Sequence, residues 1–229
     1  MRRLALSGLD AAIVDLDGTM VDTMNDFVVA LNLMLQDLRW PAVERTVVEQ
    51  LVGKGSEHLV RSVLAHLHES QTDTTLVIEA LYPKAWASFQ HHYREVNGHH
   101  SEVYAGVVEG LAHLKGRGLK LACLTNTRLA FADQLLTAKG LKPYFLHTFG
   151  GNSFERKKPD PLPLLKTCEI LGTSPSRTLM IGDSSNDARA ARAAGCPVVL
   201  VTYGYNHGEP VHAVDADDYV DSLAHLGAE

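Results

Sequence analysis

The feature that most constrains the fold is the regular alternation of short apolar runs and amphipathic stretches along residues 98–229. Apolar runs at Leu119–Leu124, Thr178–Ile181 and Val198–Val201 have the length and composition of buried parallel strands. The stretches between them carry apolar residues at helical spacing. This alternation predicts a doubly wound, Rossmann-like α/β fold built on a parallel sheet.

An earlier apolar run, Ala11–Leu16, is expected to be the first strand of the same sheet, because it leads into the turn residues Asp17, Gly18 and Thr19. We expect a further short strand near Phe145–Phe149. The expected helices of this part of the chain lie near Val107–Lys115, Leu129–Lys139, Pro161–Leu171 and Asp187–Ala194.

Residues 23–97 show helical periodicity and no clear strand pattern. The expected helices run from Thr23 to about Leu38, then over Val43–Leu51, Ser56–His68 and Thr75–Arg94, with a possible kink at Pro83. Asp26, three residues after Thr23, resembles the end of a capping box. We therefore expect an all-helical insertion after the first strand. The predicted domains are a catalytic core of residues 1–22 and 98–229 and a helical domain of residues 23–97.

Composition narrows the class of protein. The formal net charge is −6, from 21 Lys and Arg against 27 Asp and Glu, which argues against nucleic acid as a partner. Cys123, Cys168 and Cys196 lack the spacing of a metal or redox site and are expected to be reduced thiols. No apolar run approaches the roughly 20 residues that cross a bilayer. We expect a cytoplasmic protein without membrane contact, either a monomer or a homodimer.

Four groups of polar residues lie where predicted strands end. In a doubly wound sheet, ligands bind in the crevice beyond the carboxyl ends of the strands, so these groups are expected to face one site. The groups are Asp15 with Asp17, Thr125 with Asn126, Lys158, and Asp183 with Asp187.

Asp15 and Asp17 alternate along an extended segment, so one carboxylate can attack a substrate while the other transfers protons. A carboxylate can act as a covalent nucleophile in phosphoryl transfer and form an aspartyl-phosphate. Gly18 would let the backbone approach an anion closely. Taken alone, this string is also compatible with a strand end followed by a polar turn.

The acidic residues further along the chain favour a metal ion. Asp183 is placed at a strand exit, where it can join Asp15 around a hard cation, whereas Asp187 could simply cap the following helix. Four aspartates would repel a phosphate dianion, so the hypothesis requires a cation such as Mg²⁺.

Cationic and hydroxyl groups that can hold phosphate are also present. Lys158, which precedes Pro159, can bridge a nucleophile and a phosphate, although the adjacent Lys157 could do the same. Thr125 offers a hydroxyl and a backbone N–H to a phosphate oxygen.

Together these motifs resemble the aspartyl phosphatases of the haloacid dehalogenase superfamily. The matching segments, in chain order, are Asp15-Leu16-Asp17-Gly18-Thr19, Thr125-Asn126, Lys158-Pro159 and Gly182-Asp183 through Asp187. The resemblance implies that Asp15 is the nucleophile and Asp17 the general acid and base. It also implies that the phosphate group is bound by Gly18, Thr125, Asn126 and Lys158, with Thr125 and Lys158 completing the catalytic set.

By the same resemblance, Mg²⁺ is held by the Asp15 carboxylate, the Asp17 main-chain carbonyl and Asp183, with Asp187 supporting the metal shell from outside. The segment Ala190–Pro210, with its Thr-Tyr-Gly-Tyr-Asn string, is similar to the bacterial phosphoglycolate phosphatase branch. This similarity implies a small anionic metabolite, 2-phosphoglycolate, as the substrate.

In this superfamily the helical insertion acts as a cap that selects the substrate. Within it, the loop around Lys54, flanked by Gly53 and Gly55, could meet a substrate carboxylate, although an ordinary surface lysine would look the same. A sugar-phosphate phosphatase or a phosphomutase would use the same core residues, so both remain alternatives. A dehalogenase is disfavoured because it would not need Asp17. An inactive phosphate-binding regulatory module is disfavoured because every proposed catalytic group is present.

Overall fold

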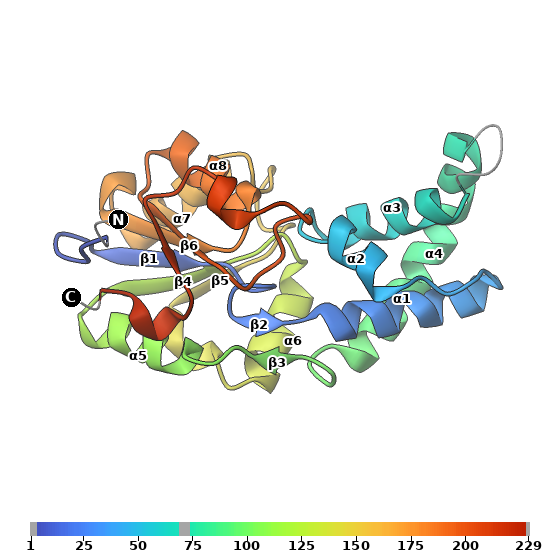
Figure 1. The fold of residues 1–229 in the computed structure, drawn as a ribbon, viewed down its shortest axis with the longest axis horizontal. Coiled ribbons are helices and arrows are strands. Elements are labelled where there is room, and N and C mark those ends of the chain that lie inside the picture. The colour runs from blue at the N-terminus through green and yellow to red at the C-terminus, as the bar shows by residue number, and fades with distance from the viewer. Residues whose placement is uncertain (1–3, 69–73, 228–229) are drawn as a thin grey trace.

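The centre of the fold is strand β1, Ala11–Val14, whose four residues are all buried between two parallel neighbours. The computed structural model describes residues 4–68 and 74–227. Within them a six-stranded sheet has the order β5-β4-β1-β6-β7-β8, and every pairing in it is parallel (Figure 1). The other strands are β4 (Lys120–Leu124), β5 (His147–Phe149), β6 (Thr178–Gly182), β7 (Val198–Val201) and β8 (Asp218–Val220).

Helices cover both faces of this sheet, α5 and α6 on one and α7 and α8 on the other (Figure 1). Their bounds are α5 Val107–Gly116, α6 Leu129–Ala138, α7 Leu162–Leu171 and α8 Ser185–Ala194. Because side chains alternate along a strand, Val14 packs in one apolar cluster with Leu111 and Leu135, while Ile13 packs in another with Leu164 and Ala188. The predicted doubly wound fold is therefore confirmed.

Four helices form a second group beside the sheet: α1 (Met24–Leu38), α2 (Arg45–Leu51), α3 (Ser56–His68) and α4 (Thr74–Val96). They bury an apolar core of their own, in which Phe27 stacks on Tyr93 at 5.1 Å and Phe89 stacks on Tyr93 at 5.3 Å between ring centroids. Pro83 lies inside α4. The all-helical character of the insertion is confirmed over its described residues.

The chain crosses between the sheet and the helical group twice, and the two crossings pair with each other. Strand β2, Val21–Asp22, runs antiparallel to β3, Glu102–Val103. Two-residue strands leave no alternation that a sequence pattern can reveal, and neither was predicted. The edge strand β8 was also missed, because its first residue is Asp218 and only Tyr219 and Val220 remain as an apolar run.

The capping box expected at Thr23 and Asp26 was wrong. Thr23 makes no side-chain capping bond to α1, and its hydroxyl donates instead to Asp17 Oδ1 at 2.9 Å. Asp26 is fully buried and accepts hydrogen bonds from the backbone N–H groups of Gly98 (2.7 Å) and His100 (2.8 Å). Asp26 therefore bonds to partners that are distant in the sequence. It links α1 to the segment at Gly98 and His100, where the chain returns from the helical group to the sheet.

The structure also bears on the expectations about the cysteines and about membrane-spanning segments. Cys123, Cys168 and Cys196 are buried and unpaired, as expected. Among residues 4–68 and 74–227, no helix combines the length and the apolar character needed to span a membrane.

Candidate active site

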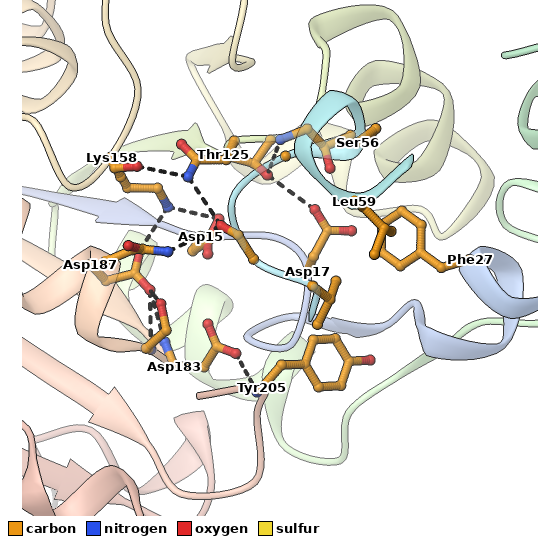
Figure 2. Close-up of a pocket in the computed structure, with 17 residues that line it drawn as sticks. Asp15, Asp17, Phe27, Ser56, Leu59, Thr125, Lys158, Asp183, Asp187 and Tyr205 are labelled. Carbon is orange, nitrogen blue, oxygen red and sulfur yellow. Dashed lines mark hydrogen bonds and ion pairs between the residues drawn. The ribbon is translucent and has the colours of Figure 1, made fainter. Parts of the chain in front are cut away.

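The predicted polar groups meet in one cavity at the carboxyl ends of β1, β4 and β6. This is where the strand order reverses, since β4 and β6 flank β1 on opposite sides. Seven of the residues singled out in the sequence line the cavity, and Figure 2 shows the cluster: Asp15, Asp17, Thr125, Asn126, Lys158, Asp183 and Asp187.

Lys158 is the cation at the centre of the cluster. Its side chain is 1% exposed, and its Nζ lies 2.9 Å from Asp15 Oδ1, 2.7 Å from Asp187 Oδ1 and 2.8 Å from the Leu124 carbonyl oxygen. These three contacts use all three donors of the ammonium group. Although burial opposes the charge, the carboxylates of Asp15 and Asp187 raise the pKa of Lys158. Lys157 does not share this position, because its Nζ pairs with Glu57 Oε2 at 2.9 Å.

The two oxygens of Asp15 have different surroundings. Oδ1 accepts hydrogen bonds from Lys158 and from the backbone N–H of Leu16 at 2.8 Å. Oδ2 receives no hydrogen bond from the part of the chain that the structure describes. Burial raises the pKa of Asp15 to about 7, although Lys158 opposes the shift. Asp15 lines the cavity with one oxygen held in place and the other free of hydrogen bonds from the described residues, an arrangement suited to a carboxylate nucleophile.

Asp17 is held by hydroxyl groups, and none of the described residues places a cation at hydrogen-bond distance from it. Oδ1 accepts from Thr23 at 2.9 Å and Oδ2 accepts from Thr125 at 3.1 Å. Burial raises the pKa of Asp17, and the hydroxyl groups around it oppose that rise. A raised pKa favours the protonated form of a carboxyl group, which is the form that a general acid requires.

Asp183 and Asp187 complete an acidic cluster. Asp15, Asp183 and Asp187 each offer an oxygen, and the three atoms lie within 4.8 Å of one another. Burial, followed by the charges of Asp187 and Asp15, raises the pKa of Asp183 well above its usual value. Buried carboxylates that resist ionisation next to one another form a fitting oxygen site for a hard divalent cation.

Asp187 is the least available of these ligands. Its Oδ2 accepts from the backbone N–H of Ser184 at 3.2 Å and from its hydroxyl at 2.8 Å, which closes a capping box at the start of α8. Its Oδ1 pairs with Lys158. Both carboxylate oxygens are therefore engaged, so Asp187 both caps the helix and orients Lys158. The sequence left open whether Asp187 caps the helix or belongs to the site, and in the structure it does both.

Gly18 does not line the cavity but lies against Asp183. Its φ is +80°, and a Cβ placed there would lie 2.3 Å from Asp183 Oδ2. On its other sides Asp183 accepts from the backbone N–H of Tyr205 at 2.5 Å and from the Thr19 hydroxyl at 3.3 Å. The glycine therefore leaves room for the acidic side chain.

The helical group closes the opposite wall of the cavity. Phe27, Ser56 and Leu59 line it, and Figure 2 shows them beyond Asp17, away from Lys158. Lys54 is exposed and does not line the cavity, so the structure does not bring it to the other candidate residues.

Sequence reasoning missed the residues of this wall. Phe27 and Leu59 sit at apolar positions of amphipathic helices and are indistinguishable in sequence from core residues. Ser56 follows a glycine at a helix start, which is a local signal for an exposed helix terminus. Tyr205 lies in a segment that the sequence singled out only by resemblance.

Comparison with known proteins agrees with this geometry. A family model described as haloacid dehalogenase-like hydrolase matches residues 12–201. A relative from Thiobacillus denitrificans named phosphoglycolate phosphatase is 44% identical, over 94% of this chain and 93% of its own. Another of that name, from Nitrosospira multiformis, is 40% identical over 94% of this chain and 92% of its own. The chain therefore belongs to the haloacid dehalogenase-like hydrolases.

A solved structure supports the same assignment. A crystal structure from Haemophilus somnus, described as a predicted phosphoglycolate phosphatase, superposes with a TM-score of 0.89 at 30% sequence identity. The match covers 96% of this chain and 97% of the other. The sheet and the helical group are thus both shared with that protein.

Gly18→Ala should destabilise the protein by at least about 1 kcal/mol, because alanine disfavours the positive φ and its methyl group would displace the Asp183 carboxylate. The matched control is Gly116→Ala at the end of α5, where φ is not positive and no atom lies within 4 Å of the added Cβ. This control should be neutral or stabilising by up to about 1 kcal/mol. Urea unfolding measures both, and equal effects would contradict the role given to Gly18.

Proposed function

We propose that the protein is a magnesium-dependent phosphatase that hydrolyses a small phosphomonoester, 2-phosphoglycolate, through an aspartyl-phosphate on Asp15. The observation that carries the proposal is the asymmetric carboxylate of Asp15 in the cavity that Asp17 also lines. One of its oxygens is held by Lys158, and the other receives no hydrogen bond from the described residues. The substrate is suggested by the relatives named phosphoglycolate phosphatase.

The proposed reaction has two halves. In the first, Asp15 Oδ2 attacks phosphorus, the bond from phosphorus to the ester oxygen breaks, and Asp17 gives its proton to the departing alkoxide. In the second, Asp17 takes a proton from a water molecule that attacks phosphorus, inorganic phosphate leaves, and the Asp15 carboxylate is restored. Thr125 and the main-chain amide of Asn126 hold the phosphoryl oxygens, and the buried positive charge of Lys158 attracts them although its three donors are bound by protein groups. The main-chain N–H of Gly18 does not take part, because it donates to the Val21 carbonyl at 2.9 Å.

The residues that would hold Mg²⁺ are the Asp15 carboxylate, the Asp17 main-chain carbonyl and Asp183, with Asp187 outside because both of its oxygens are engaged. When bound, the ion supplies positive charge that offsets the repulsion between the phosphate group and the carboxylates.

We further propose that residues 23–97 are a cap domain on a core of residues 1–22 and 98–229, and that the cap shields the reaction from bulk water. The wall that the helical group already contributes to the cavity supports this division. The three buried, unpaired cysteines fit work in the reducing cytoplasm. Either a monomer or a homodimer would satisfy the mechanism.

The first test is phosphate release from 2-phosphoglycolate, hexose phosphates, nucleotides and pyrophosphate, with Mg²⁺ and with a chelator. We expect 2-phosphoglycolate to give the highest kcat/KM, and the chelator to abolish turnover. Asp15→Asn should lower kcat by at least about a thousandfold, because the amide cannot form the covalent intermediate.

The same panel separates the alternatives. A phosphomutase would isomerise a sugar phosphate with little net release of phosphate, and a sugar-phosphate phosphatase would prefer a hexose phosphate. Undiminished turnover by Asp15→Asn, or turnover that survives the chelator, would refute the mechanism itself.

The second test is the pH dependence of Mg²⁺ binding. The pKa of Asp15 is raised to about 7, so its protonated form stabilises the metal-free fold fully below the unfolded-state pKa near 4, and this stability is lost as pH rises through about 7. The raised pKa of Asp183 acts in the same direction. Mg²⁺ binds the ionised carboxylates. Saturating Mg²⁺ should therefore raise the melting temperature by about 5 °C at pH 8 and by much less at pH 5.5.

Asp183→Asn is the control for this measurement, because it removes one proposed ligand charge with little change in shape. It should lose most of the Mg²⁺-dependent shift at pH 8. A shift that is the same at both pH values, or is unaltered by the substitution, would contradict the metal assignment.

A further inference from the structure

Ser56 is a buried hydroxyl without a hydrogen-bond partner. The residue is 3% exposed, and its Oγ makes no hydrogen bond within the part of the chain that the structure describes. It lines the same cavity as Asp15 and Asp17, and it stands on the wall opposite Lys158 (Figure 2). Burying a polar group without a hydrogen-bond partner costs free energy. A bound ligand that accepts a hydrogen bond from the Ser56 hydroxyl would remove this cost.

The backbone around Ser56 favours a negatively charged ligand. Ser56 is the first residue of α3, a helix of 13 residues, and both it and Gly55 line the cavity. The first N–H groups of a helix lack partners within the helix, and its N-terminus carries a partial positive charge. A hydroxyl and free amides at one helix start form a site for a small anion.

None of the described residues that line this side of the cavity is a cation, and the neighbouring Lys157 Nζ is paired with Glu57. Phe27, Val52 and Leu59 are apolar, and Lys158, the one lysine among the lining residues, has all three donors engaged elsewhere. Lys54 is exposed and outside the lining. A group bound here would accept hydrogen bonds from neutral donors, the Ser56 hydroxyl and the first N–H groups of α3. A carboxylate accepts such bonds.

Contacts with the core fix the position of this helix start. The Gly53 carbonyl accepts hydrogen bonds from the side-chain amides of Asn126 (3.1 Å) and Asn186 (3.2 Å). On the other side of Ser56, Glu57 pairs with Arg128 at 2.8 Å and with Lys157 at 2.9 Å. Ser56 is thus anchored through both neighbouring segments and sits at a defined place relative to the catalytic residues.

The cavity that Ser56 shares with Asp15 and Lys158 is small. The volume open to the centre of a water-sized sphere is about 30 Å³, which corresponds to roughly two or three water molecules. So small a cavity favours a substrate whose leaving group has few heavy atoms.

We propose that the Ser56 hydroxyl and the first turn of α3 bind a carboxylate on the leaving group, so that the substrate class is the phosphomonoesters of small hydroxy acids. The inference rests on the proposed phosphatase function and assigns substrate recognition to Ser56 in place of Lys54.

The test compares kcat/KM for 2-phosphoglycolate with kcat/KM for 2-hydroxyethyl phosphate, in which a hydroxymethyl group replaces the carboxylate. Ser56→Ala should lower the ratio of these two values by about 10- to 100-fold, the range expected for losing a hydrogen bond to a charged group. Ser56→Gly, which removes the same hydroxyl, should act alike and serves as the second variant if the alanine protein folds poorly. Melting temperatures report folding.

The matched control is Ser62→Ala on the same helix, since the Ser62 hydroxyl lies 3.3 Å from His58 Nδ1 and outside the cavity lining. It should leave the ratio unchanged, and so should Lys54→Gln. If the wild-type enzyme favours 2-phosphoglycolate and the Ser56 variants have the same ratio of kcat/KM values, this inference alone is overturned. The same holds if Lys54→Gln lowers that ratio as strongly as the Ser56 substitutions are expected to. A wild-type enzyme that hydrolyses neither ester would overturn the proposed function and this inference with it.

Discussion

The site depends on the buried ammonium group of Lys158. Its contacts with Asp15 and Asp187 place one positive charge among four aspartates, so the cluster remains short of positive charge and burial raises the pKa values of Asp15 and Asp183. Removing one partner from a buried ion pair typically costs about 3–5 kcal/mol, because the remaining charge is left uncompensated. The same shortage makes the cavity receptive to a divalent cation, and with that cation to a phosphate group.

The site also depends on the junction between the sheet and the helical group. Residues that hold the two parts together there also contact the proposed catalytic and metal-binding residues. Thr23 stands at the start of α1 and donates to Asp17, the proposed proton carrier. Tyr205 donates its backbone N–H to Asp183 and its hydroxyl to Asp22 in the first crossing. A change in the angle between the two parts would therefore disturb both the proposed proton carrier and the proposed metal ligand.

Sequence patterns predicted the features that depend on local composition. The strands β1, β6 and β7 are continuous apolar runs, and Lys158 belongs to a Lys-Pro motif in the loop before α7. Strand β8 and the short ribbon of β2 and β3 have no comparable pattern. Asp26 was misread because its spacing imitates a helix cap, whereas its partners, the N–H groups of Gly98 and His100, lie more than seventy residues away along the chain. Ser56 was missed for the same reason, since only tertiary packing brings the start of α3 to the cavity.

The most direct test of the central claim is to trap the covalent intermediate. Protein mixed with substrate and Mg²⁺ is quenched in acid within a single turnover, digested, and analysed by peptide mass spectrometry. The account predicts a mass increase of one phosphoryl group on the peptide that contains Asp15, absent from Asp15→Asn. A phosphoryl group on another residue, or full turnover by Asp15→Asn, would contradict it.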